Sequence, residues 1–197
     1  SSEVLELNAV YGRKRRSLTR PRTLRPIVDG ALLRQGEIDA HLNGAVIPRP
    51  ALVGTVTDEG RQLADRAAIT SASELRAFID AEFGDAAERI AALYPAQNAD
   101  DVPRALSALY GDTQFNCGAA ALERSVRNHA PVWRHVFAFH DEAPNKAPVH
   151  GEDVAYTFGV PAFVDGIQTR SASARADHVA DRTSKAIAAY RSEEHTS

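Results

Sequence analysis

Hydrophobic and polar residues alternate along this chain in two different periods, one typical of strands and one typical of helices. Residues 50–56 form a continuous apolar run bounded by Pro50 and by a Thr-Asp-Glu-Gly sequence, which is typical of a strand buried in a parallel sheet. Residues 132–139 alternate with period 2 and are rich in aromatic side chains, which indicates a second strand. A shorter strand–turn–strand unit is predicted over residues 26–33, around an Asp-Gly pair.

Helical patterns fill the stretch between the two main strands. Ser71 and Glu74 form a capping-box pattern at the start of one helix, and Gly84 ends it. Start and stop signals of the same kind predict further helices over residues 85–94, from 101 to Gly111, and over 113–128. A short helical turn is expected at 37–43, a flexible loop at 166–176 and a last amphipathic helix at 177–190. The order of elements favours an α/β fold with a helical insertion between two strands.

The composition is that of one soluble globular domain. The chain has 197 residues, of which 44% are hydrophobic and 25% charged. No apolar run approaches the roughly 20 residues that a membrane-spanning helix needs, so no membrane span is predicted. The single cysteine, Cys117, cannot form an internal disulfide, and we interpret it as a small buried residue. The compartment stays open between cytoplasmic and secreted.

One charge anomaly stands near the beginning of the chain. Seven basic and no acidic residues lie between Arg13 and Arg25. Such a run is found in nucleic-acid-binding arms and localisation signals, and also in solvated loops. No interleaved aromatic residues and no DNA-binding motif accompany it. We therefore interpret it as a surface loop and predict no nucleic-acid partner.

The candidate chemistry lies just after each main strand. Asp58 and Glu59 follow the first strand, and His150 stands on a loop after the second. Neighbouring parallel strands end at the same edge of a sheet, so Glu59 and His150 are expected to meet there. An imidazole acts as a general base when a carboxylate fixes its tautomer and stabilises the imidazolium. The alternative is that His150 is an ordinary loop histidine and Glu59 a carboxylate favoured by a helix dipole.

A metal site is less well supported by the spacing. Six possible metal ligands occur within fourteen residues, but without the His-Glu-x-x-His spacing of hydrolytic zinc sites. We predict neither a metal site nor a cofactor, and interpret this stretch as a polar loop beside an active site. The ligands in question are His140, Asp141, Glu142, His150, Glu152 and Asp153. Trp133, Phe137 and Phe139 are interpreted as core residues.

Several segments resemble the type B carboxylesterase family, which includes the cholinesterases. They are Leu-Val-Gly-Thr-x-x-Asp-Glu-Gly at 52–60 and Ala-Pro-Val-His-Gly-x-Asp-x-x-Tyr-x-Phe-Gly at 147–159, with Pro-x-x-Asp-Gly at 26–30 and Asp-x-x-Phe at 112–115. The resemblance implies an α/β-hydrolase sheet, of which this chain is a C-terminal, incomplete part. It also implies that Glu59 is the acid and His150 the base of a Ser-His-Glu triad. Asp153 stands where the family usually has a structural Glu.

The family's nucleophile is missing from these residues. The chain contains neither a Gly-x-Ser-x-Gly segment nor a Gly-Gly pair for an oxyanion hole. We expect the full protein to hydrolyse carboxylic esters, and this chain alone to be inactive. The alternative from another class is a non-catalytic cholinesterase-like binding or adhesion domain. We also expect residues 1–190 to be the esterase portion and residues 191–197 to be a non-native tail, because they read like a translated sequencing adapter.

Overall fold

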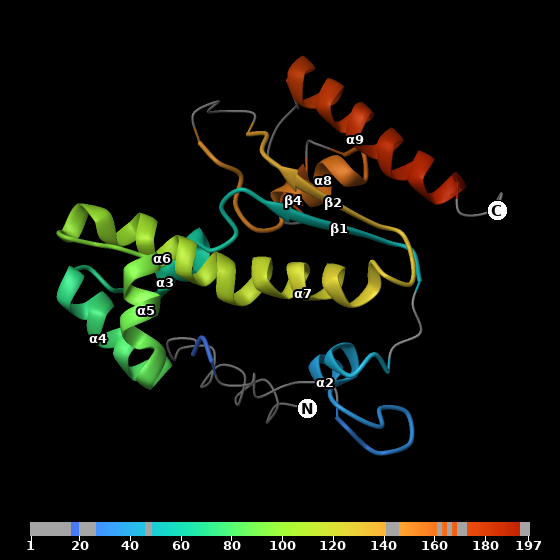
Figure 1. The fold of residues 1–197 in the computed structure, drawn as a ribbon. Coiled ribbons are helices and arrows are strands. Elements are labelled where there is room, and N and C mark those ends of the chain that lie inside the picture. Colours follow the sequence, from blue (N-terminus) through green and yellow to red (C-terminus); the bar gives the residue numbers. More distant parts are fainter. Residues whose placement is uncertain are drawn as a thin grey trace, which may run out of the picture.

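Two parallel strands with helices on both sides make up the centre of the molecule (Figure 1). The computed structural model describes residues 17–19, 27–45, 49–140, 146–160, 163–164, 167–168 and 173–193. Strand β1 (Ala51–Val56) pairs with β2 (Val132–Phe137) in parallel, in a register that runs from Ala51 opposite Val132 to Val56 opposite Phe137. Helix α7 (Cys117–Val126) contacts both strands, and α9 (Ala174–Glu193) lies on their other side. The two main predicted strands, at 50–56 and 132–139, their parallel pairing and the α/β class are confirmed.

The long connection from β1 to β2 is helical, as predicted. The Ser71–Glu74 capping box is present and starts α4, and Gly84 ends that helix. One helix in this connection, α3, was not predicted from the sequence. The connection contains α3 (Arg61–Ala67), α4 (Ala72–Phe83), the 3-10 turn η1 (Gly84–Ala86), α5 (Ala87–Leu93), the 3-10 turn η2 (Ala99–Asp101), α6 (Val102–Gly111), the π-helical turn η3 (Asp112–Asn116) and α7.

The helices on either side of Gly111 form one continuous rod, whereas the sequence predicted a break there. Gly111 has φ −57° and ψ −48°, which are right-handed helical angles, so it does not end α6. It is buried beside the backbone of Gly60. The π-helical turn η3 then joins α6 to α7.

The beginning of the described chain differs from the prediction. Residues 27–33 form no strand, so the predicted strand–turn–strand unit is wrong. The carboxylate of Asp29 accepts the N–H groups of Ala31, Leu32 and Leu33 at 2.9–3.0 Å, and this local turn competes with strand pairing. The predicted helical turn follows as α2 (Glu37–Leu42). Of the basic run between Arg13 and Arg25, only residues 17–19 lie in the described part, where Glu82 accepts hydrogen bonds from Ser17, Leu18 and Thr19.

After β2 the chain returns over the strand ends. Helix α8 (Glu152–Thr157) follows the His150 loop, and the two-residue strands β3 (Phe163–Val164) and β4 (Ile167–Gln168) pair antiparallel. The predicted flexible loop at 166–176 therefore contains part of a hairpin and the start of α9. Helix α9 extends further at both ends than the predicted 177–190. None of the helices described is long and apolar enough to cross a membrane.

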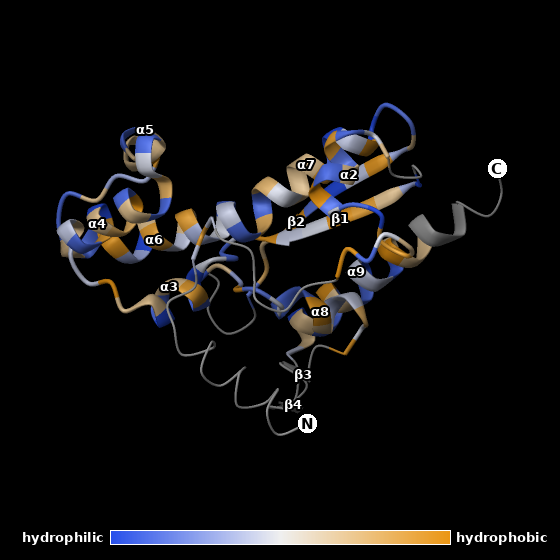
Figure 2. Cartoon of the chain, turned by 90° about the horizontal axis from the view of Figure 1, so that it is seen from below, coloured by the Kyte–Doolittle hydropathy of each residue, from blue (hydrophilic) through white to orange (hydrophobic). Residues whose placement is uncertain are grey.

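Two hydrophobic clusters hold the elements together. In Figure 2, helices α3 to α6 gather at one end of the strands, and the first cluster lies among them. Its most buried side chains are Leu75, Ile79, Val102, Leu106, Leu109 and Tyr110. The second cluster joins the strand ends to α8 and α9 through Val56, Phe137, Ala155, Tyr156, Ala176 and Ala180. Phe137 and Phe139 are core residues as predicted, but Trp133 is 46% exposed and is not.

Gly60 lies where the two clusters meet. A Cβ atom at Gly60 would stand 1.9 Å from the carbonyl oxygen of Ser107 and 2.5 Å from the amide nitrogen of Gly111. Both of these atoms belong to the backbone of α6, which cannot move aside as a flexible side chain would. The start of α3 can therefore touch α6 only because residue 60 has no side chain.

We expect Gly60→Ala to lower the free energy of unfolding by about 3 kcal/mol, the upper part of the range for overpacking. The matched control is Gly118→Ala in α7, where nothing lies within 4 Å of the added Cβ. That change should raise the free energy of unfolding by up to about 1 kcal/mol, since Ala is the better helix former. Urea unfolding of both variants measures the difference. Equal stabilities would contradict the close contact of Gly60 with α6.

Candidate active site

Backbone pairing continues past the end of the strands and carries the two candidate residues together. The amide of Thr57 donates to the carbonyl of Phe137 at 3.1 Å, extending the β1–β2 ladder by one step. The amide of Asp58 then donates to the carbonyl of Pro148, also at 3.1 Å, and Asp58 forms a parallel bridge with Val149. The loop after β2 thus becomes the neighbour of the segment after β1. Glu59 and His150, one residue further along each segment, come side by side.

Glu59 is a buried carboxylate with both oxygens engaged. Its side chain is 7% exposed. One oxygen, Oε1, accepts the N–H of Val56 at 2.9 Å, and the other, Oε2, lies 2.6 Å from Nδ1 of His150. The bond to Val56 fixes the carboxylate against the end of the strand, so its second oxygen is aimed in one direction. The expected contact between Glu59 and His150 is present in the structure.

The imidazole of His150 has one ring nitrogen bound and the other edge open to solvent. The side chain is 54% exposed. An ionised carboxylate can only accept a hydrogen bond, so the nitrogen facing it, Nδ1, carries the proton in the neutral ring. The other nitrogen, Nε2, is then an acceptor. This is the tautomer that a general base requires.

The neighbouring carboxylate, Asp58, is engaged elsewhere. Its Oδ2 accepts Nε–H of Arg61 at 2.6 Å and also forms an ion pair with that guanidinium. Its Oδ1 accepts the hydroxyl of Ser107, which ties the segment after β1 to α6. The two adjacent carboxylates therefore have separate partners, and the imidazole faces only Glu59.

The His150 loop is fixed by the first turn of α8. Gly151 has φ +89°, a left-handed conformation that favours glycine and lets the chain turn directly into the helix. The Oε2 atom of Glu152 accepts the N–H of Val149 at 3.0 Å. The carboxylate that braces this loop is thus Glu152, although the family resemblance pointed to Asp153. His140 approaches the same Glu152 at 3.9 Å.

Phe115 is a member of this site that the sequence did not connect with it. Its ring centroid lies 4.4 Å from that of His150, with 34° between the ring planes. Phe115 is the last residue of the Asp-x-x-Phe segment that resembles the family. Nothing in the sequence indicates contact with a histidine 35 positions away, because the contact depends on how α6 and α7 join.

Of the six possible metal ligands, Asp141 and Glu142 lie outside the described residues. Among the residues that the structure does describe, no three His, Cys, Asp or Glu side chains form a group able to hold a metal ion. Cys117, predicted to be buried, is exposed at the start of α7.

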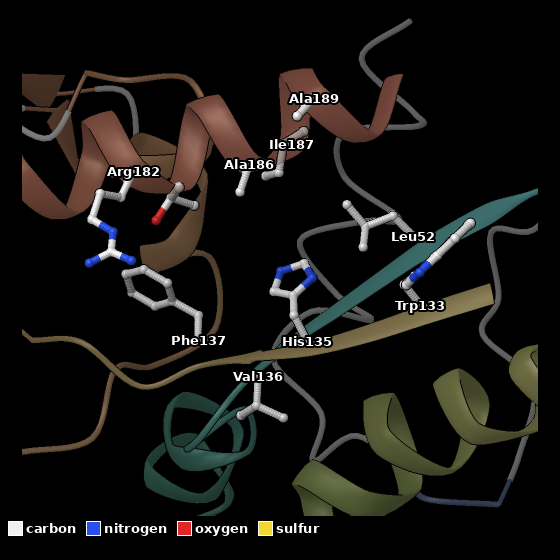
Figure 3. Close-up of a pocket in the computed structure, with 10 residues that line it drawn as sticks. Leu52, Trp133, His135, Val136, Phe137, Arg182, Ala186, Ile187 and Ala189 are labelled. Carbon is white, nitrogen blue, oxygen red and sulfur yellow. The ribbon is translucent and has the colours of Figure 1, made fainter. Parts of the chain in front are cut away.

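A cavity of about 530 Å³ lies away from His150, between the strands and α9 (Figure 3). His135 and Leu52 point into it from β2 and β1, opposite Ala186 and Ile187 of α9. Trp133 also lines it, which accounts for its exposure. Neither Glu59, His150 nor Phe115 contributes to this cavity, so it is separate from the candidate active site.

Comparisons with known proteins identify the family to which the chain belongs. A model of the carboxylesterase family matches residues 6–188, nearly the whole chain. The chain belongs to the carboxylesterase family. A curated relative, the fumonisin B1 esterase of Sphingopyxis macrogoltabida, is 38% identical over 144 residues, which are 73% of this chain and 27% of the relative. The chain thus spans about a quarter of that esterase's length.

Solved esterase structures have the same fold. One structure of a PNB esterase superposes with a TM-score of 0.69 over 93% of this chain and 37% of its own, at 20% identity. A thermophilic PNB esterase superposes with a TM-score of 0.61 over 83% of this chain and 33% of its own, at 24% identity. These neighbours are α/β-hydrolase esterases. The predicted fold, part of an α/β-hydrolase domain, is therefore confirmed.

The Glu59 contact sets the tautomer of His150, and Glu59→Gln tests this. The glutamine carbonyl can still accept the N–H of Val56, but its NH₂ group then faces Nδ1 and can only donate. We expect the neutral imidazole to switch from the Nδ1–H to the Nε2–H tautomer, and stability to fall by about 1–3 kcal/mol. Nitrogen-15 NMR of the imidazole reports the tautomer, and urea unfolding the stability.

The matched control for this experiment is Asp58→Asn, which alters the adjacent carboxylate. Asp58 contacts Arg61 and Ser107 and not His150. Its substitution should leave the tautomer as in the unmodified chain. A tautomer that is unchanged in Glu59→Gln would contradict the assignment of the Nδ1 proton.

Proposed function

We propose that this chain supplies the general base and the acid of a Ser-His-Glu triad that hydrolyses carboxylic esters. The observation that carries the proposal is the 2.6 Å contact between Nδ1 of His150 and the buried carboxylate of Glu59, with the other edge of the ring open. Membership of the carboxylesterase family supports it, as does the relative named as an esterase. The nucleophilic serine and the oxyanion-hole donors are proposed to come from a part of the protein outside these 197 residues.

In this mechanism each residue has one task. Nε2 of His150 accepts the proton of the serine hydroxyl as that oxygen attacks the ester carbonyl. The proton then passes to the leaving alkoxide, and the same nitrogen later deprotonates the water that hydrolyses the acyl-enzyme. Glu59 keeps Nδ1 protonated and offsets the positive charge of the imidazolium. Burial strengthens this interaction because little water screens the carboxylate.

The substrate is proposed to be a small-molecule carboxylic ester. The relative named for fumonisin B1 makes that compound the first natural ester to assay. A non-catalytic binding or adhesion domain is the second candidate. A binding domain has no need of a buried carboxylate aimed at a histidine, so the Glu59–His150 pair favours the enzyme.

We expect His150→Ala in the full-length protein to abolish turnover of an activated ester, because the group proposed to take the serine proton is then lost. Glu59→Gln should lower kcat by about 10⁴-fold, the loss seen when a triad acid is replaced by its amide. Asp153→Asn is the control and should retain activity, since Glu152 braces the loop. Normal kcat in either triad variant would refute the role given to that residue.

The 197-residue chain alone should hydrolyse no ester. A base and its orienting carboxylate cannot begin acyl transfer without a nucleophile and oxyanion donors. Release of p-nitrophenol from an activated ester measures this directly. Turnover that disappears in His150→Ala would show that one of the serines or the exposed Cys117 within this chain acts as the nucleophile.

A further inference from the structure

Glu59 holds the imidazole of His150 at one atom only. Apart from its covalent attachment at Cγ, the ring is then held by a single hydrogen bond, and exposed side chains change orientation within nanoseconds. His150 is 54% exposed, so the surrounding protein leaves much of the ring unrestrained. A general base has to keep its acceptor nitrogen within hydrogen-bonding reach of the group that it deprotonates. A second restraint on the ring is therefore of direct use to the chemistry.

Phe115 is placed to give that restraint. Its ring packs on the imidazole at a centroid distance of 4.4 Å with a tilt of 34°, so it covers one face of His150. Glu59 meets the edge of the ring and Phe115 meets its face. Tilting of the imidazole toward its covered face would drive it into the phenyl ring, whereas the observed orientation keeps favourable aromatic contact.

The π-helical turn η3 presents Phe115 to the site. A π turn is rare and less stable than an α-helical turn, and it occurs often at functional sites. Here it is braced by side chains. The carboxylate of Asp112 accepts the hydroxyl of Tyr94 at 2.7 Å and the side-chain amide of Asn116 at 2.9 Å. These bonds tie one end of the turn to the other, and tie the turn to Tyr94, the residue that follows α5. Thr113 donates its hydroxyl to the carbonyl of Leu109 at 2.7 Å.

The hydrogen bond from Tyr94 to Asp112 keeps its donor as the pH rises. Burial of the phenol and its hydrogen bond to the Asp112 carboxylate both raise the pKa of Tyr94. The hydroxyl therefore keeps its proton and remains a donor over the whole range in which an esterase works.

The same helical segment also touches the acid. A Cβ atom placed on Gly111, the residue just before η3, would lie 3.8 Å from Cβ of Glu59 and 3.4 Å from the amide nitrogen of Gly60. One continuous stretch, residues 111–115, thus abuts Glu59 at its start and His150 at its end. The relative placement of the acid and the base is set by this segment as well as by the sheet.

We infer that Phe115 is a positioning residue for His150, and that η3 is the element that holds Phe115 in place. The inference rests on the proposed function, because positioning matters only if His150 is a base. Phe115 takes no part in bond making. It keeps Nε2 aimed at the position of the serine hydroxyl while Glu59 sets the tautomer.

The first test is a spectroscopic experiment on the 197-residue chain that needs no activity. We expect the Nδ1–H proton of His150, visible by NMR in the unmodified chain, to be lost through exchange with water in Phe115→Leu. Phe115→Tyr keeps the ring and should retain the signal. Phe83→Leu makes the same change in the helical cluster and should also retain it. A signal that persists in Phe115→Leu would overturn the inference.

A variant with a smaller change covers the case in which Phe115→Leu does not fold. Tyr94→Phe removes only the hydroxyl that braces Asp112. The Nδ1–H proton of His150 should exchange with water faster in Tyr94→Phe than in Phe83→Leu. If exchange is unchanged in Tyr94→Phe, the brace has no effect on His150 and the role of η3 is refuted.

The second test uses the full-length protein and separates this inference from the proposed function. Phe115→Leu should lower kcat by about 10- to 100-fold, a loss typical of misplaced catalytic groups, with a smaller change in KM, and Phe115→Tyr should restore most of it. A loss confined to KM would make Phe115 a substrate contact and refute positioning. Activity that survives His150→Ala would refute the proposed function itself. Loss in His150→Ala with full activity in Phe115→Leu would refute only the inference.

Discussion

The parallel pairing of β1 with β2, continued beyond the strands, is the constraint on which the rest of the structure depends. Main-chain hydrogen bonds run without a break from the strands to Thr57 and Asp58, so the position of the His150 loop is set by the backbone. The side chains of Glu59 and His150 therefore need to span only a short distance to meet. The contact of Glu59 with His150 follows from a ladder whose register is specified by buried residues such as Val56 and Phe137.

The site lies at the junction of two hydrophobic clusters, and this explains why glycine stands at residue 60. The helical cluster fixes α6, and the strand-end cluster fixes α8. Gly60 lets the two bodies approach until its backbone meets that of Ser107 and Gly111 in α6. Glu59 precedes one of these glycines, and Phe115 follows the other by four residues. Any separation of the clusters would therefore change both contacts of His150 at once.

The features of this arrangement that depend on local sequence patterns could be predicted from the sequence. The apolar run at 50–56, the capping box at Ser71 and the polar residues after each strand predicted the strands, a helix and the Glu59–His150 pair. Three features depend on tertiary contacts and were not predicted or were misjudged. Phe115 reaches His150 from a π turn braced by Tyr94, the residue that follows α5. Gly111 reads as a helix end but has helical dihedral angles and lies beside Gly60. Trp133 has a core pattern yet faces a cavity.

The chemistry of the site depends as much on the carboxylates that do not touch the imidazole as on the one that does. Asp58, Glu59 and Glu152 all lie within three residues of the bridge between Asp58 and Val149. Asp58 is paired with Arg61, and Glu152 accepts the amide of Val149. A second unpaired carboxylate near the ring would accept a hydrogen bond from the other ring nitrogen, and both tautomers would then be stabilised. Because its neighbours are engaged, Glu59 alone selects Nδ1, and its own bond to Val56 prevents it from turning away.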